Sequence, residues 1–107
     1  MKNKCNKKSL GSIGMPIFNG ETYLEEAIIS LLSQTYTNLE LVISDNCSND
    51  STKNICLKYQ EKDSRIIYFR QENQIDVEDN FQFALERSTG DFFMWAADDD
   101  TWDREWI

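Results

Sequence analysis

Short apolar runs alternate four times along this chain with segments of helical periodicity, and this alternation restricts the fold more than any other feature of the sequence. The apolar runs cover residues 10–18, 39–44, 65–69 and 91–97 and predict strands. Apolar residues spaced by three and four predict three amphipathic helices between them: Leu24, Ala27, Ile28, Leu31 and Leu32; then Thr52, Ile55, Cys56 and Tyr59; then Val77, Phe81, Ala84 and Leu85. We therefore expect an α/β sandwich, with a mostly parallel sheet, flanking helices and right-handed crossovers.

Two local features refine this pattern. Residues 91–97 are almost entirely apolar, which is typical of a strand that is buried on both faces. Gly90 follows the third helical segment, where a glycine in the left-handed conformation often ends a helix. The pattern therefore predicts an interior fourth strand and a helix that ends near Gly90.

Composition and charge argue against several classes of function. The chain has 107 residues, enough for one domain, and 40% of them are hydrophobic. A formal net charge of -8 argues against a nucleic-acid binder, because such a protein needs a basic face for the phosphates. The sequence contains no His, so Ser-His and Cys-His nucleophilic catalysis and histidine metal ligation are excluded.

The cysteines and the N-terminal residues bear on location. Cys5, Cys47 and Cys56 form an odd set without CxxC spacing, which favours reduced thiols over disulfides or a zinc site. No apolar run follows the basic residues 1–8, so we expect no signal peptide and no membrane span. These features favour a cytoplasmic protein.

Polar segments follow the first, second and fourth predicted strands. They are residues 19–21, residues 45–48 and the run Asp98-Asp99-Asp100. The carboxyl ends of parallel strands share one edge of a sheet, and ligands of α/β sheets bind beyond that edge. The topology therefore predicts a crevice that gathers Asp45 and the Asp98-Asp99-Asp100 run.

The chemistry of three adjacent acids favours a divalent cation. Crowded carboxylates repel one another unless a cation lies between them, and Mg2+ and Mn2+ are often held by carboxylates together with substrate phosphates. The alternative is an acidic, solvated terminus, although the apolar residues 92–97 lead directly into the acids. Asp45 has a similar alternative as a turn or helix-capping residue. The sequence has neither a GxGxxG nor a P-loop fingerprint, so phosphate binding would depend on metal.

Four ordered blocks of the sequence resemble glycosyltransferase family 2. They are SIGMPIFNGETYL at residues 12–24, SLLSQTY at 30–36, LELVISDNCSNDST at 39–52, and TGDFF at 89–93 followed by Asp98-Asp99-Asp100. The last block is similar to the strand that leads into the DxD metal motif of that family. The resemblance runs from about Ser12 to the end of the chain.

This resemblance implies the GT-A fold and a nucleotide-diphospho-sugar partner, commonly a UDP-sugar, bound with Mn2+ or Mg2+. By position, it implies that Pro16, Phe18 and Glu21 line the nucleotide pocket and that Asp45 contacts the base. It also implies that Asp98 lies near the ribose or phosphate, that Asp99 holds the metal and that Asp100 supports it. The reaction would transfer the sugar to an acceptor in polysaccharide or glycolipid synthesis.

Two departures from the family pattern limit these expectations. Ala97 stands where the family often has the first Asp of its metal motif. Family members also need a second half that binds the acceptor and supplies the catalytic base, which we expect beyond Ile107. Residues 1–107 would then be the N-terminal donor-binding part of a GT-A domain, with residues 1–9 flexible and with no activity alone.

Several alternatives follow from that reading. The chain could be a non-catalytic nucleotide- or metal-binding fragment that lacks the acceptor half. A sugar nucleotidyltransferase is disfavoured, because its glycine-rich basic loop is not seen after the first strand.

An exposed sheet edge would favour a homodimer. The full-length protein could lie at the inner face of the membrane.

Overall fold

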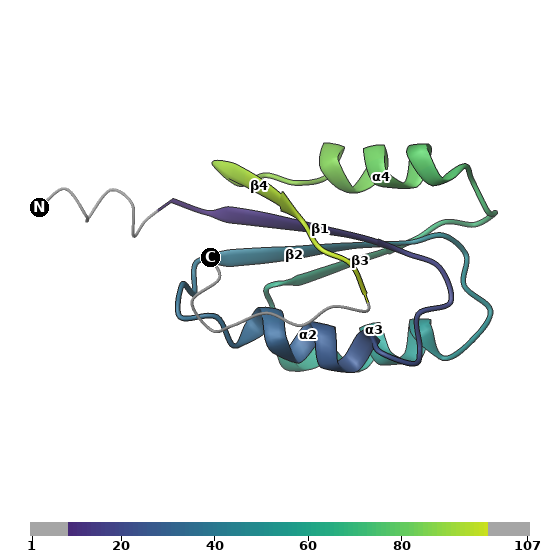
Figure 1. The fold of residues 1–107 in the computed structure, drawn as a ribbon, viewed down its shortest axis with the longest axis horizontal. Helices are drawn as coiled ribbons and strands as arrows, with labels where there is room; N and C mark the ends of the chain where they lie inside the picture. The colour runs from purple at the N-terminus through teal and green to yellow at the C-terminus, as the bar shows by residue number, and fades with distance from the viewer. Residues whose placement is uncertain (1–8, 99–107) are drawn as a thin grey trace, which may run out of the picture.

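The computed structural model describes residues 9–98, which form a four-stranded parallel sheet between two layers of helices (Figure 1). The elements in chain order are β1 (Gly11–Ile17), α2 (Leu24–Leu32), β2 (Leu39–Asp45), α3 (Thr52–Lys62), β3 (Ile66–Arg70), α4 (Val77–Glu86) and β4 (Phe92–Trp95). All neighbouring strands pair in parallel. The predicted α/β sandwich is therefore confirmed.

The strand order is β3-β2-β1-β4. The chain moves outward from β1 to β3 and then crosses back, so the order reverses between β1 and β4. Figure 1 shows the consequence: α2 and α3 cover one face of the sheet, and α4 covers the other. In open α/β sheets, ligands bind beyond the carboxyl ends of the strands at such a reversal. The space beyond β1 and β4 is therefore the expected ligand position in this topology.

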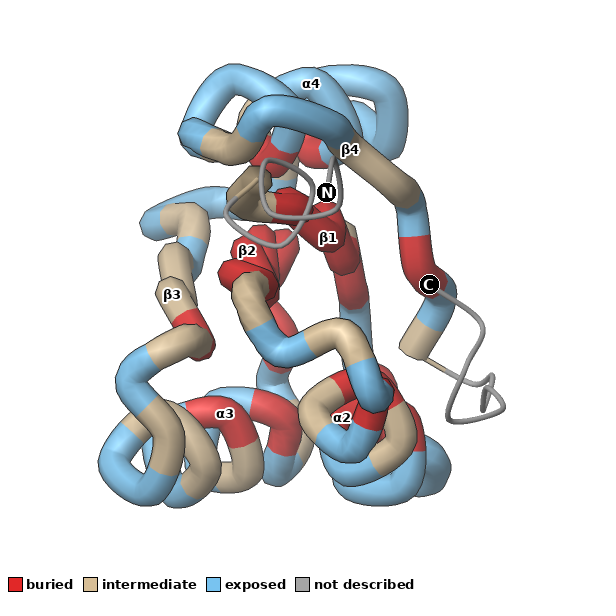
Figure 2. The backbone as a smooth tube through the Cα atoms, turned by 90° about the vertical axis from the view of Figure 1, so that its left-hand side faces the viewer, coloured by how far each residue is buried: buried red, intermediate tan, exposed pale blue. Residues whose placement is uncertain are grey.

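The hydrophobic core lies in the two central strands and the helix faces against them (Figure 2). Leu24, Ala27, Ile28 and Leu31, which share the predicted stripe of α2, are all fully buried. On β2 every residue is buried. Removing one such side chain costs about 2–5 kcal/mol, so this core fixes the positions of the loops at the sheet edge.

β4 corrects the prediction of an interior strand, because it is partly exposed. Phe92 and Trp95 are 38% and 43% exposed, and β4 pairs only with β1 among the described residues. Composition alone could not distinguish an apolar edge strand from a central one. The position at the edge follows instead from the crossover through α4.

Gly90 corrects the second local prediction. α4 ends at Glu86 with Arg87 as its C-cap, and no glycine among the described residues has a positive φ angle. Gly90 instead lies against β1, where an added Cβ would be 2.6 Å from the Leu10 carbonyl oxygen and from Ser12 Oγ. The glycine is required for close approach of the backbone.

The buried carboxylate of Glu40 fixes the start of β4 on the sheet. It accepts hydrogen bonds from Ser12 Oγ at 2.6 Å, Thr89 N–H at 2.7 Å and Thr89 Oγ1 at 3.0 Å. Ser12 Oγ in turn accepts the Gly90 N–H at 2.7 Å. Burial acts to raise the pKa of Glu40, but these hydrogen bonds outweigh it and hold the pKa below its ordinary value. The network sets the position from which β4 runs towards Asp98.

None of the three described helices has the length and apolar character needed to span a membrane.

Candidate functional site

The loops after β1 and β2 meet at the carboxyl edge of the sheet and are joined through hydrogen bonds. Three consecutive backbone N–H groups of the first loop point to side-chain oxygens of the second. The pairs are Asn19 N–H with Ser48 Oγ at 2.7 Å, Gly20 N–H with Thr52 Oγ1 at 2.9 Å, and Glu21 N–H with Asp50 Oδ2 at 3.3 Å. Consecutive N–H groups of this kind could otherwise bind an anion. Because protein oxygens already satisfy them, this loop does not offer a phosphate cradle.

The second loop donates back to the first. Asn49 N–H bonds to Asn19 Oδ1 at 2.9 Å, and Ser51 N–H bonds to Glu21 Oε1 at 2.8 Å. Glu21, which is predicted to line the nucleotide pocket, is exposed. Its carboxylate accepts this hydrogen bond at the N-terminal end of α3. Negative charge is favourable at that helix end. Asn19 has a φ of 52°, a conformation that Asn tolerates better than most residues.

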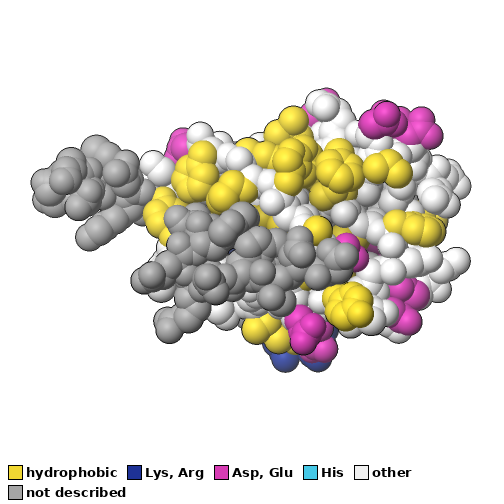
Figure 3. All heavy atoms as spheres, viewed as in Figure 1, with side chains coloured by type: hydrophobic (Ala, Val, Ile, Leu, Met, Phe, Trp, Pro, Cys, Tyr) yellow, Lys and Arg dark blue, Asp and Glu magenta, His cyan; other side chains and the backbone are white. Residues whose placement is uncertain are grey.

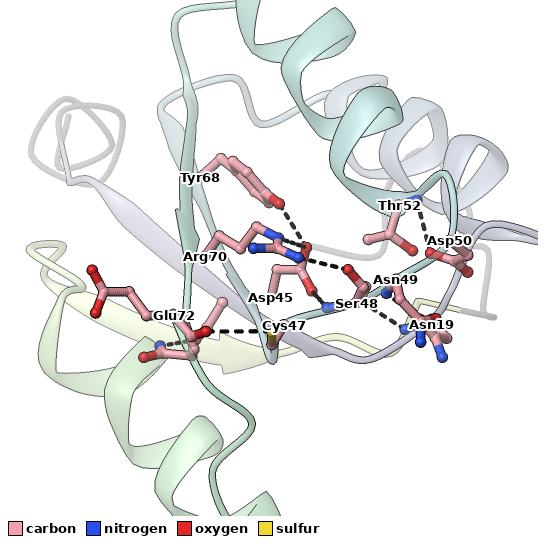
Figure 4. A network of polar contacts seen from close by, with 12 residues as sticks. Asn19, Asp45, Cys47, Ser48, Asn49, Asp50, Thr52, Tyr68, Arg70 and Glu72 are labelled. Carbon is pink, nitrogen blue, oxygen red and sulfur yellow. Dashed lines mark hydrogen bonds and ion pairs between the residues drawn. The ribbon is translucent and has the colours of Figure 1, made fainter.

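Asp45, at the end of β2, lies at the centre of a buried polar network (Figure 4). Its Oδ1 accepts the Ser48 N–H at 2.9 Å, and its Oδ2 accepts the Tyr68 hydroxyl at 2.6 Å. Arg70 Nε lies 3.9 Å from Oδ2, and Arg70 Nη2 donates to the Ser48 carbonyl at 2.8 Å. The Asp45 side chain is 0% exposed. A contact with a base, as the family resemblance implies, therefore requires the surrounding side chains to move.

The acid–base properties of this network follow from burial. Burial and the hydrogen bond to Asp45 raise the pKa of Tyr68, so its hydroxyl remains a donor throughout the neutral range. Burial, with a smaller contribution from Asp45, raises the pKa of the Cys56 thiol to about 12. Cys56 therefore remains a protonated thiol in the core. Asp45 thus lies between the hydroxyl donor of Tyr68 and the guanidinium of Arg70.

Asp98 reaches the same edge from β4. A Cβ added at Gly20 would be 2.0 Å from Asp98 Oδ2, so the carboxylate lies directly against the loop after β1. Pro16 and Asp98, both predicted to contact the nucleotide, also line one hollow of about 400 Å3 together with Phe81, Trp95, Ala96 and Ala97. The predicted meeting of the β1 and β4 ends is therefore present in the fold.

The remaining predicted residues divide into two groups. Phe18, just after β1, is 45% exposed, so its ring is accessible at the edge. Asp99 and Asp100, the predicted metal ligands, lie outside the described residues. Within residues 9–98 no group of three or more His, Cys, Asp or Glu side chains could hold a metal ion. The described part of the chain contributes Asp98 as the half-buried carboxylate beside Gly20.

Sequence reasoning missed two pairs of residues at this edge. Tyr68 and Arg70 lie two positions apart on β3, so they share one face, and the register places Arg70 opposite Asp45. The alternation of β3 could have indicated them once the strand order was known. Phe81 and Trp95 could not have been paired, because their contact depends on how α4 packs across the sheet.

Relatives of this chain are glycosyltransferases. It is 33% identical over 102 residues to the putative teichuronic acid biosynthesis glycosyltransferase TuaG of Bacillus subtilis, covering 94% of this chain and 40% of the relative. It is 36% identical over 90 residues to the GalNAc(5)-diNAcBac-PP-undecaprenol beta-1,3-glucosyltransferase of Campylobacter jejuni, covering 83% and 29%. The chain thus spans less than half the length of these two relatives.

Solved structures share the fold. Residues 1–349 of S. aureus TarS in complex with UDP-GlcNAc superpose with a TM-score of 0.79 at 27% identity, over 88% of this chain and 28% of that TarS fragment. The mannosyltransferase PcManGT of Pyrobaculum calidifontis has a TM-score of 0.81 at 21% identity, over 88% and 29%, and this likeness concerns the fold alone. The model of glycosyl transferase family 2 matches residues 12–107. With its GT-A arrangement of strands and helices and this match over nearly its whole length, the chain belongs to glycosyl transferase family 2.

Proposed function

We propose that this chain supplies the donor site of a glycosyltransferase that moves a sugar from a nucleotide-diphospho-sugar to an acceptor during glycan synthesis. The observation that carries the proposal is the meeting of Asp98 with the β1 loop at Gly20, at the carboxyl edge where the strand order reverses. That position is where α/β sheets bind nucleotides. Family membership supports the reaction class.

A UDP-sugar is the proposed donor. TarS, 27% identical to this chain, has been solved with UDP-GlcNAc, and its similar region covers 88% of this chain. Glycan synthesis is supported by the similarity to TuaG, a putative teichuronic acid biosynthesis glycosyltransferase, and to the Campylobacter beta-1,3-glucosyltransferase. In this proposal Phe18 and Pro16 flank the nucleotide, and Asp98 faces its ribose or phosphate. Asp45 stabilises the base pocket from within its buried hydrogen-bond network.

A divalent cation, Mn2+ or Mg2+, is the proposed cofactor. The N–H groups of the loop after β1 already donate to protein oxygens, so another group must supply the positive charge for a diphosphate. Asp98 provides a carboxylate of the required chemistry at this edge, and the family resemblance assigns the ion to Asp99 with support from Asp100. When bound, such an ion would neutralise charge on the departing diphosphate.

Titration calorimetry of the chain with UDP tests the proposal. We expect binding in Mn2+ or Mg2+, strong weakening by EDTA, and loss of the metal-dependent part in Asp99→Ala. Glu61→Gln, an exposed substitution on α3, is the matched control and should leave UDP binding unchanged. Equal UDP affinity with and without EDTA would overturn the metal role. A folded chain that binds no uridine nucleotide under any condition would overturn the donor site.

A further inference from the structure

Thr52, the first residue of α3, is a polar residue that is fully buried below the carboxyl edge. Its Oγ1 accepts the Gly20 N–H at 2.9 Å, so its side chain joins α3 to the loop after β1. A buried N–H that loses its acceptor leaves its backbone in an unfavourable position, because water cannot replace the lost bond there. The Thr52 hydroxyl therefore holds Gly20 at one place on the edge.

The carboxylate of Asp50 orients that hydroxyl (Figure 4). Asp50 Oδ1 accepts the Thr52 N–H at 2.9 Å, and the carboxylate also accepts the Thr52 hydroxyl. Burial acts to raise the pKa of Asp50, but these bonds and the Glu21 N–H outweigh it and hold the pKa below its ordinary value. Asp50 is therefore ionised at neutral pH. Because the hydroxyl proton points to Asp50, a lone pair of Thr52 Oγ1 faces Gly20.

Gly20 is the contact through which this arrangement reaches the proposed nucleotide position. A Cβ added at Gly20 would lie 2.0 Å from Asp98 Oδ2 and 3.1 Å from Asp98 Cγ, so the carboxylate packs directly on the Gly20 backbone. On another side Asp98 borders a hollow lined mainly by apolar side chains, and Figure 3 shows hydrophobic side chains gathered over α4 and β4. A displacement of Gly20 therefore changes where the Asp98 carboxylate can lie.

We propose that Thr52 is a positioning residue for donor binding, because its hydroxyl holds the Gly20 backbone where Gly20 seats the Asp98 carboxylate. Thr52 is fully buried, so it acts on the nucleotide only through these two neighbours. The inference rests on the proposed function, in which Asp98 faces the ribose or phosphate. It adds a residue of α3 to a site that otherwise consists of residues from the loops and strand ends.

A role in packing alone makes a different prediction from a positioning role. Thr52 has a methyl group and a hydroxyl, and only the hydroxyl bonds to Gly20. Thr52→Val keeps the branched shape and removes the hydroxyl, whereas Thr52→Ser keeps the hydroxyl and removes the methyl group. If only packing mattered, Thr52→Ser would impair UDP binding at least as much as Thr52→Val.

Titration calorimetry of the whole chain with UDP and Mg2+ tests this difference. We expect Thr52→Val to weaken UDP binding roughly two- to tenfold, as the loss of one hydrogen bond would, and Thr52→Ser to stay within about twofold of wild type. Thr37→Val is the matched control, because Thr37 is exposed and lies just before β2, at the opposite edge of the sheet. Ile66→Val, a buried change at the start of β3, is the control for stability. Both controls should leave UDP affinity unchanged.

A double-variant cycle shows whether Thr52 acts through Asp98. Asp98→Ala removes the carboxylate, so Thr52→Val should cause no further loss of affinity in that background. Additive losses would mean that Thr52 affects the site by another route, and they would overturn the proposal. Asp50→Ala, an exposed or partly exposed substitution that leaves the core intact, should weaken UDP binding about two- to fivefold by the same route.

The remaining outcomes separate the role of Thr52 from the proposed function. Wild-type affinity in a folded Thr52→Val variant, or an equal loss in Thr52→Ser, would overturn the role of Thr52 and leave the donor site intact. If Thr52→Val does not fold, wild-type affinity in Asp50→Ala overturns the proposal instead. A folded wild-type chain that binds no UDP would overturn the proposed function and, with it, a role for Thr52 in donor binding.

Discussion

Tyr68→Phe removes one hydroxyl from the network around Asp45. That hydroxyl donates to a fully buried carboxylate at 2.6 Å, and hydrogen bonds to charged groups contribute about 1.5–3 kcal/mol. The Ser48 N–H and Arg70 remain, so we expect unfolding to become easier by about 2 kcal/mol. With a urea slope of about 2 kcal/mol/M, the midpoint falls by about 1 M. Urea unfolding followed by circular dichroism measures this shift.

Tyr59→Phe is the matched control, because the same atom is removed from a hydrogen bond at the surface. The Tyr59 hydroxyl donates to the exposed carboxylate of Glu25 between α3 and α2. Water can replace this bond, so we expect little change in the midpoint. The reasoning about Asp45 is refuted if the two variants shift the urea midpoint equally.

Three further predictions concern other parts of the edge and the sheet. Folding lowers the pKa of Glu40, so the ionised carboxylate stabilises the fold above the ordinary pKa of 4.5, and this stabilisation is lost as the pH falls through the folded pKa. In urea unfolding, the difference in stability between wild type and Glu40→Gln should therefore shrink as the pH falls. A difference that does not depend on pH contradicts this prediction. Gly20→Ala should displace Asp98 and weaken UDP binding in calorimetry on the order of tenfold with little change in melting temperature; unchanged affinity refutes the role of that contact. Cys47 has a φ of 62°, so in urea unfolding Cys47→Gly should have a free energy of unfolding equal to that of wild type or higher by up to about 1 kcal/mol. Cys47→Val should be less stable than wild type, and the opposite order would show that the strain is absent.

The type and order of the strands and helices were predictable because most local signals agreed with the global arrangement. The stripe of α2 and the apolar run of β2 carry their own periodicity, and parallel strands impose a shared carboxyl edge. The exposure of β4 was not predictable in this way. Its apolar sequence resembles that of an interior strand, and only the crossover through α4 places it at the edge.

The site was predictable as a place but not as a set of contacts. Asp45 and Asp98 were expected at one edge, and the loops that carry them do meet through Gly20 and its neighbours. The burial of Asp45 depends on Tyr68, a residue 23 positions away whose placement follows from the register between β2 and β3. No local pattern encodes that register, so a ligand-facing Asp and a network Asp look the same in the sequence.

Nuclear magnetic resonance mapping of UDP binding to the 15N-labelled chain in Mg2+ tests most directly whether the carboxyl edge is the donor site. We predict the largest amide shifts at residues 18–21, 45–48 and 95–98, with small shifts along the outer face of α3. Shifts concentrated on α3, or no shifts at saturating UDP in a folded chain, would contradict a donor site at this edge.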